Sequence, residues 1–562
     1  MSSSLTSRRR FLQAGAATLA TTAVATAVAP RSAADIPVEP PAGTLPFLHG
    51  VASGDPIPDS VVLWTRVTPA ADALPGSGLG APVTLRWEVA ADEGFTRLVT
   101  SGTVAAEAAS DHTVHVDPHG LAPATVYFYR FVVTDGAFAG SVSPVGRTKT
   151  APALGADVSE LTFAVASCAN WESGFFSAYR DMAARGRAGQ FDATVFLGDY
   201  IYEYGQGQYS GFGPVRLHHP EHEIVSLADY RIRYGRYRTD PDLQDAHGAL
   251  PWVVVWDDHE TANNSWADGA ENHDPTSEGG WIARRNAAMQ AYFEWMPVRA
   301  TSPSQGGHIY RSLTFGNLVE LTMMDLRTYR SQSLELKVSG PLSITNSTNP
   351  ARTMMGSEQM QWLAGKLETS AAAWNVLGNS VMFCPLNLVT IQDNPQTRAV
   401  VGALSSNIST TGAAVPSLAY NGDQWDGYAA ARRGLLDLLA SKGKTPLFLT
   451  GDVHSEWAHT VDYDGRTLGA ELVCTSVSAP NINEELKLPA GNPVSKVAQD
   501  LVKMANPHCR HVNLDEHGYS FVRITHDAAE MHWLRVRNVM EQDSPVTDAV
   551  MLTWRRGVGF TG

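Results

Sequence analysis

The chain has 562 residues, of which 44% are hydrophobic and 18% charged, and its 57 acidic and 42 basic side chains give a net charge of −15. This length suggests two or three domains, and this composition excludes a wholly disordered or fibrous chain. The acidic balance gives no electrostatic reason to bind nucleic acid, so we expect no such partner. Four cysteines are too few for a disulfide scaffold.

The first predicted element is an export signal over residues 1–34. Residues 7–13 follow the twin-arginine pattern S-R-R-x-F-L, and a weakly apolar stretch precedes a small-residue site at 32–34. A disordered basic tail is the alternative interpretation. Because these residues carry four arginines and no acid, their removal takes the net charge to −19. We expect the twin-arginine machinery to export the folded chain to the periplasm or the extracellular space.

The second predicted element is a β-sandwich domain over residues 43–150. Apolar residues alternate with polar ones, as at Val83, Leu85, Trp87 and Val89, which is the period of a strand with one buried face. Short strands separated by Gly, Pro and Asp turns are typical of an immunoglobulin or fibronectin-III sandwich. The segment has no cluster of catalytic residue types, so we interpret it as a scaffold or lid.

A linker rich in Pro, Ala and Gly over residues 149–156 precedes the third predicted element, an α/β domain over 157–540. Here short apolar runs alternate with helical stretches, such as the one at 283–295, which Pro297 stops. Residues 541–562 form a C-terminal segment.

Several apolar runs of this domain end in a residue able to bind a metal. Open α/β sheets place their sites at the carboxyl ends of strands. One Asp in that place is often a turn or helix cap, but five such endings together predict a polynuclear metal site. The residues at these endings are Cys168, Asp199 with Tyr202, Asp258, Asn379, and Asp452 with His454.

The donor atoms indicate two kinds of metal. Thiolate, phenolate and imidazole donors suit iron(III), which predicts an iron site of Cys168, Asp199, Tyr202 and His454. Carboxylate and amide oxygens suit calcium, manganese or magnesium. The sequence therefore predicts one or two divalent ions held by Asp199, Asp258, Asn379 and Asp452, with Asp199 bridging the two kinds of site.

Sequence blocks at these positions resemble a known family. Residues 198–202, 258–260 and 451–454 are similar to degenerate forms of the metallophosphoesterase blocks G-D-x-x-Y, G-N-H-E and G-H-x-H. Further blocks at 50–56, 59–66, 325–330, 374–379 and 425–428 follow in the order found in the PhoD-like alkaline phosphatase family. This resemblance covers residues from about 45 to about 530.

The resemblance implies a four-layer α/β/β/α sandwich that carries an iron(III)–calcium phosphoesterase site. It further implies that Asn264 and Arg327 contact phosphate, with Arg330 and Arg398 as alternative guanidinium donors. A hydroxide on the metals is expected to attack phosphorus in line with the leaving oxygen. His259 is expected to hydrogen-bond the substrate or protonate the leaving alkoxide, or else to orient a neighbouring group.

These observations favour a monomeric, secreted alkaline phosphatase or phosphodiesterase that hydrolyses small phosphate mono- or diesters and scavenges phosphate. A phospholipase-D-like diesterase of the same family is an alternative. A non-catalytic phosphate-ester binding protein is a third, although Cys168, Asp199 and His454 are all present.

Overall fold

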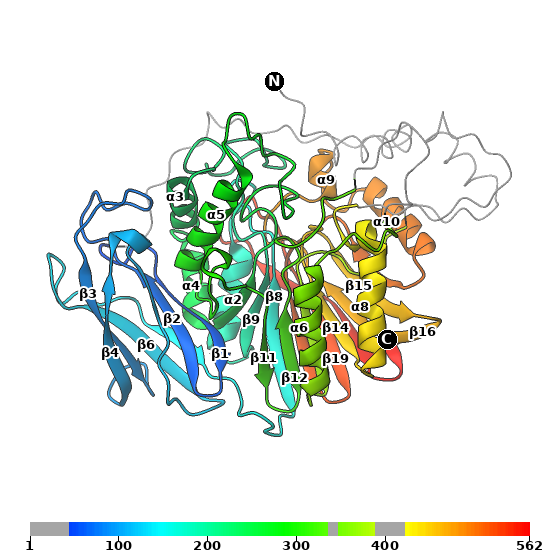
Figure 1. Ribbon diagram of the computed structural model, residues 1–562, viewed down its shortest axis with the longest axis horizontal. Coiled ribbons are helices and arrows are strands. Elements are labelled where there is room, and N and C mark those ends of the chain that lie inside the picture. The colour runs from blue at the N-terminus through cyan, green and yellow to red at the C-terminus, as the bar shows by residue number, and fades with distance from the viewer. Residues whose placement is uncertain (1–43, 335–346, 388–421, 562) are drawn as a thin grey trace.

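The computed structural model describes residues 44–334, 347–387 and 422–561, arranged around two large β-sheets (Figure 1). The predicted signal at 1–34 and the candidate Arg398 lie outside these ranges. Within them, no helix combines the length and apolar character that crossing a membrane requires.

The larger sheet has ten strands and is parallel at its centre, where β8, β9 and β10 pair side by side. These three strands are almost entirely buried, which explains why they read in the sequence as continuous apolar runs. The order across the sheet is β21 (Gly559–Thr561), β20 (Val546–Arg555), β19 (Ala528–Val536), β18 (His517–Thr525), β8 (Glu160–Ala166), β9 (Ala193–Leu197), β10 (Pro251–Val255), β1 (Val51–Ile57), β2 (Ser60–Arg66) and β5 (Thr113–Val116).

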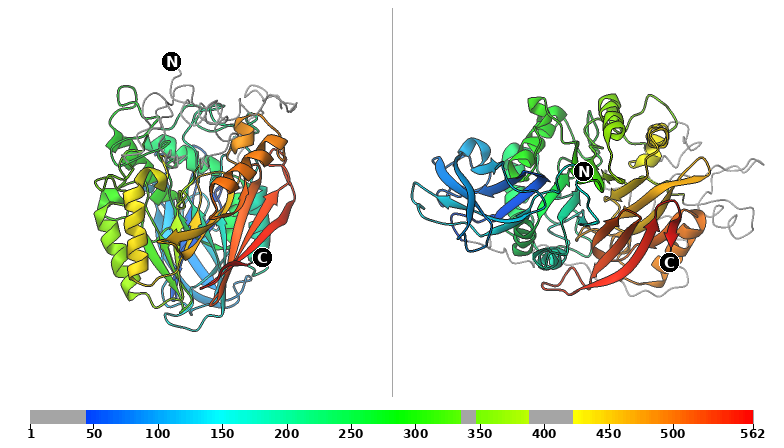
Figure 2. Two further views of the ribbon diagram at one scale, coloured as in Figure 1. Left: turned by 90° about the vertical axis from the view of Figure 1, so that its right-hand side faces the viewer. Right: turned by 90° about the horizontal axis from the view of Figure 1, so that it is seen from below.

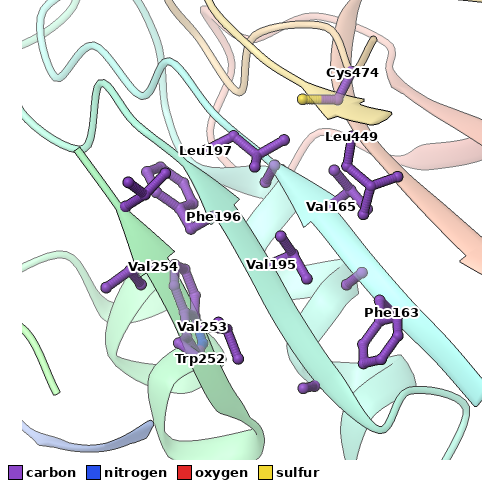
Figure 3. Packing of buried hydrophobic residues seen from close by; sticks show 14 of the residues in the cluster. Phe163, Val165, Val195, Phe196, Leu197, Trp252, Val253, Val254, Leu449 and Cys474 are labelled. Atoms are coloured by element: carbon purple, nitrogen blue, oxygen red, sulfur yellow. The ribbon is translucent and has the colours of Figure 1, made fainter. Parts of the chain in front are cut away.

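The second sheet has seven strands, with β12, β13, β14 and β16 parallel to one another. Its order is β11 (Arg311–Phe315), β12 (Val319–Met323), β13 (Trp374–Asn379), β14 (Pro446–Thr450), β16 (Arg466–Val473), β15 (Glu456–Tyr463) and β17 (Cys509–Asn513). The two sheets share one buried apolar cluster, and Figure 3 shows Leu449 of β14 and Cys474 close to Val165 and Leu197 of the larger sheet.

Helices cover the outer face of each sheet (Figures 1 and 2). On the larger sheet these are α2 (Ser177–Arg187), α3 (Leu227–Tyr237), α4 (Pro241–Ala249) and α5 (Trp281–Trp295). On the smaller sheet, α6 (Gly356–Thr369) and α8 (Ala429–Ser441) bury leucines against β13 and β14. Two further helices, α9 (Ile482–Glu485) and α10 (Pro493–Ala505), precede β17. The predicted mixed α/β fold, with two sheets between helical layers, is therefore confirmed.

The N-terminal strands take part in both a separate sheet and the larger one. A four-stranded sheet is formed by β4 (Leu98–Ala106), β3 (Val83–Ala90), β6 (Val126–Val133) and β7 (Gly146–Lys149). It packs on β1, β2 and β5 through residues such as Leu85 and Tyr129 against Leu63. However, β1 also pairs with β10, so this second face is an edge of the ten-stranded sheet. The predicted strands are present, and an immunoglobulin or fibronectin-III topology and the domain boundaries stay predictions.

A glycine lets the ends of two central strands approach each other. Gly198, directly after β9, has a φ of +96°, and a Cβ built on it would lie 2.4 Å from Cβ of Asp257. Only glycine combines this backbone conformation with this close approach. The residues that follow β9 and β10 are thereby brought together.

We predict that Gly198→Ala destabilises the fold by about 3 kcal/mol or more, because it adds a steric clash to a strained backbone. Urea unfolding followed by circular dichroism measures the change. Gly189→Ala is the matched control, since Gly189 has a φ of +76° but no neighbour within 4 Å of the added Cβ. We expect about 1 kcal/mol there, and equal losses in both variants would contradict the close-approach argument.

Candidate metal centre

Five of the predicted ligands converge at the carboxyl ends of four strands, with Asp199 at the centre. The ligand atoms of Cys168, Asp199 and His454 lie within 4.8 Å of one another. So do those of Asp199, Asp258 and His259, and those of the group Asp199, Asp257, Asp258 and Asp452. All of these residues are buried, and Asp199 belongs to all three of these groups. The Asp199 carboxylate therefore lies close enough to both sets of ligands to bridge the two predicted metal sites.

The predicted tyrosine lies beside the first group. The Tyr202 hydroxyl donates to Oδ2 of Asp199 at 3.1 Å and lies 3.1 Å from Nε2 of His454. Nδ1 of His454 lies 2.7 Å from the carbonyl oxygen of Pro480, which can only accept, so Nδ1 carries the proton. When the ring carries this proton alone, Nε2 is an electron-pair donor that faces Asp199 and Tyr202. Together with the thiol of Cys168, these atoms form a mixed sulfur, nitrogen and oxygen donor set.

Several residues of this centre adopt the left-handed backbone conformation. Their φ values are +61° at Cys168, +57° at Asp199, +52° at Asn264, +66° at Asp452 and +52° at His454. This conformation costs a residue other than glycine on the order of 1 kcal/mol. Such strain concentrates where the surrounding structure must aim side chains for function.

The centre is short of positive charge around Asp199. Burial raises the pKa of the Cys168 thiol well above its ordinary value, and the Asp199 carboxylate raises it further. Burial and then Asp199 have the same effect on the pKa of Tyr202. Within the described residues, Oδ1 of Asp199 is buried without a hydrogen-bond partner. A buried carboxylate oxygen with no donor is costly, so this donor set fits a bound cation.

Arg327 lies against the group of four aspartates, and its guanidinium is buried. Its guanidinium binds both oxygens of Asp257, and Nη1 donates to Oδ2 of Asp423 at 2.7 Å. Nη2 lies 3.4 Å from Oδ1 of Asp258 and 3.5 Å from Oδ1 of Asp452. The guanidinium is thus at the predicted divalent-ion site. The phosphate contact expected of Arg327 stays a prediction.

The alternative guanidinium donor, Arg330, is also engaged by protein groups. It donates to the Ser265 carbonyl oxygen at 2.8 Å and to Oδ1 of Asp423 at 2.6 Å. Asp423 therefore joins the two arginines in one buried ion-pair network.

His259 is held by an acid that the sequence did not single out as a site residue. Nδ1 of His259 lies 2.7 Å from Oε2 of Glu203, while the ring packs on Tyr202 at 4.3 Å between centroids. A ring nitrogen also lies within 4.8 Å of carboxylate oxygens of Asp199 and Asp258. Burial alone would lower the pKa of His259, but Glu203 and these two aspartates raise it well above its ordinary value. The ring is thereby oriented with one nitrogen toward the metal centre.

Asn264 supports Asp258 through its backbone. Its N–H donates to Oδ2 of Asp258 at 2.5 Å, and its side-chain amide nitrogen donates to Glu271. Its Oδ1 is buried and, among the described residues, has no hydrogen-bond partner. In this orientation the available atom is an acceptor, which suits a cation better than a phosphate oxygen. A phosphate contact by Asn264 stays a prediction.

Asn379 ends β13 beside Thr450 of β14, to which its amide nitrogen donates at 3.0 Å. Its Oδ1 accepts a hydrogen bond from Nε1 of Trp425 at 3.0 Å. Gln424, which directly precedes Trp425 in the sequence, donates to Oδ2 of Asp452 at 2.7 Å. Two successive side chains therefore touch two of the predicted ligands, and the ligand role of Asn379 stays a prediction.

Comparisons with known proteins agree with this arrangement. The model of the PhoD-like phosphatase family matches residues 163–533, and the model of its N-terminal domain matches 31–152. Alkaline phosphatase D of Bacillus subtilis (strain 168) is 39% identical over 530 residues, which are 92% of this chain and 82% of that protein. The chain belongs to the PhoD-like phosphatase family. It is a phosphoric ester hydrolase.

A solved structure titled "Structure of PhoD" has 37% sequence identity to this phosphatase, with a TM-score of 0.79 over 93% of each chain. The resemblance to the PhoD-like family that the sequence blocks indicate is thereby confirmed, and the match covers most of this phosphatase.

Four residues at the centre of this PhoD-like phosphatase were not among the predicted site residues. Asp257 carried a signal, because it directly precedes Asp258 after β10. Glu203 carried the same kind of signal, because it directly follows Tyr202, whereas Asp423 and Gln424 carried none, since each reaches the centre by a contact far apart in sequence.

Proposed function

We propose that this phosphoric ester hydrolase is a metal-dependent alkaline phosphatase that acts on small phosphate esters. The observation that carries the proposal is the position of the Asp199 carboxylate, which belongs to every group of candidate ligands at the centre. Cys168, Asp199, Tyr202 and His454 would hold iron(III). Asp199, Asp258, Asn379 and Asp452 would hold one or two calcium ions, for which manganese or magnesium are alternatives.

When bound, such cations lower the pKa of water and neutralise charge on the phosphoryl oxygens. Water gives up a proton as its oxygen bonds to phosphorus, the bond from phosphorus to the ester oxygen breaks, and the leaving oxygen takes up a proton. His259 is suited to this last step because Glu203 holds Nδ1 and the ring has a nitrogen within 4.8 Å of carboxylate oxygens of Asp199 and Asp258. The guanidinium of Arg327, which lies 3.4 Å from Asp258 and 3.5 Å from Asp452, would supply positive charge beside a phosphoryl oxygen.

We further propose that the chain is exported in folded form by the twin-arginine route, to the periplasm or beyond, and scavenges phosphate there as a monomer. The support for export is the leader pattern at residues 7–13. Insertion of metal before export would fit a centre with a thiolate ligand.

Elemental analysis of the purified chain tests the metal assignment. We expect iron and calcium in the same preparation, and hydrolysis of a phosphate monoester and a diester that strong chelation abolishes. A visible absorption band from tyrosinate-to-iron charge transfer should disappear in Tyr202→Phe. Tyr209→Phe is the control, because Tyr209 stacks on Tyr202 but is not a proposed ligand. Absence of iron, or activity that survives chelation, would overturn the mixed-metal proposal.

His259→Ala tests the proposed proton donor. We predict a fall in kcat of about 10²- to 10⁴-fold, the usual contribution of general acid catalysis, with iron and calcium contents unchanged. Glu203→Gln should lower kcat less, because it keeps a hydrogen-bond acceptor for Nδ1 and removes only its charge. Normal turnover of metal-loaded His259→Ala would rule out the catalytic role.

A further inference from the structure

A second buried polar cluster lies at the end of β14, apart from the proposed ligands. It is built on Glu471 of β16, whose carboxylate accepts four hydrogen bonds. Oε1 accepts from the Phe383 N–H at 2.7 Å and the Thr450 hydroxyl at 2.8 Å. Oε2 accepts from the Cys384 N–H at 2.9 Å and Nδ1 of His459 at 3.0 Å. Although Cys384, His459 and Glu471 are close enough to hold a metal, the carboxylate lone pairs are all in use. The cluster is therefore closed to a cation.

Glu471 is kept ionised by its neighbours. Burial opposes ionisation, but the hydrogen bond and charge of His459 hold the pKa of the carboxyl below its ordinary value. Burial also opposes a charge on His459, yet the nearby Cys509 and the hydrogen-bonded carboxylate of Glu471 raise the pKa of the imidazole to about 9. An ionised carboxylate accepts hydrogen bonds and donates none.

Because the Glu471 carboxylate donates no hydrogen bond, it sets the direction of each hydrogen bond in a series that runs from Glu471 through Thr450 to Asn379. Because Glu471 only accepts, the single hydroxyl hydrogen of Thr450 points to it. The oxygen of Thr450 is then free only to accept, and the amide nitrogen of Asn379 lies 3.0 Å away. The other amide hydrogen of Asn379 points to the carbonyl oxygen of Val381. Both hydrogens of the amide are thereby committed on this side.

The opposite orientation of the Asn379 amide would create three unfavourable contacts. Its oxygen would face the oxygens of Thr450 and Val381, neither of which has a hydrogen to offer. Its nitrogen would face the N–H of Trp425. The observed orientation instead turns Oδ1 toward Trp425, whose neighbour Gln424 contacts the proposed ligand Asp452.

We propose that Glu471, acting through Thr450, is a positioning residue that turns the oxygen of Asn379 toward the divalent-ion site. This inference rests on the proposed role of Asn379 as a ligand. Groups that orient metal ligands in this way commonly change metal affinity by about 10- to 100-fold when removed. Glu471 would thus control calcium binding without touching the ion.

Thr450→Val tests the inference, because it removes the hydroxyl while keeping the shape of the side chain. Thr450→Ser is the matched control that keeps the hydroxyl. We expect Thr450→Val to weaken Ca²⁺ binding by about tenfold or more, measured by equilibrium dialysis of the full chain, with its iron content unchanged. Thr450→Ser should bind Ca²⁺ within about threefold of the unaltered chain. Unchanged binding in Thr450→Val, or equal losses in both variants, would overturn the inference.

Two further variants separate this inference from the ligand assignment beneath it. Asn379→Ala should weaken Ca²⁺ binding at least as much as Thr450→Val. If Asn379→Ala has no effect, the ligand assignment is wrong; if it alone has an effect, only the positioning role is wrong. Glu471→Gln introduces an N–H among four donors and should also weaken Ca²⁺ binding, and combining it with Thr450→Val should add little to either change. If the double variant loses as much Ca²⁺ affinity as the two single losses combined, Glu471 does not act through Thr450.

Discussion

The concentration of buried acid around Asp199 is the constraint on which the rest of the structure depends. The carboxylates of Asp199, Asp257, Asp258 and Asp452 have oxygens within 4.8 Å of one another, and all four side chains are buried. Charges at such distances in a site shielded from water repel strongly unless cations compensate them. Arg327 compensates part of this charge through Asp257. We attribute the remaining compensation to metal ions, which would also turn an acidic chain into a binder of phosphate.

The fold provides this concentration by bringing strand ends from two sheets together. Asp199 follows a central strand of the ten-stranded sheet, and Asp452 follows β14 of the seven-stranded sheet, across the shared apolar core. Glycines permit the approach: a Cβ on Gly451 would lie 2.8 Å from Oγ of Ser167, much as one on Gly198 would meet Asp257. The left-handed conformations of the ligand-bearing residues fit the same need, because they turn side chains inward at the ends of straight strands.

The sequence predicts most of the candidate site because of one physical rule. Parallel strands buried on both faces read as apolar runs, and their carboxyl ends meet at one edge of a sheet. Cys168, Asp199, Asp258, Asp452 and His454 were found in this way, and the structure brings their side chains together. The partners of these residues follow no such rule. Glu203 reaches His259 from another loop, and Asp423 reaches Arg327 from another segment, so neither contact leaves a periodic signal. The pairing of β1 with β10 was also unpredictable, because alternation identifies the buried face of a strand but not its neighbour.

The metal content of Asp199→Ala tests the central claim most directly. If Asp199 bridges two kinds of site, this one change removes both iron and calcium from the folded protein. Cys168→Ser should remove iron alone, and Asp452→Ala should remove calcium alone, while circular dichroism verifies that each variant is folded. The account predicts that Asp199→Ala combines the two losses. Retention of either metal at its normal content in Asp199→Ala would contradict it.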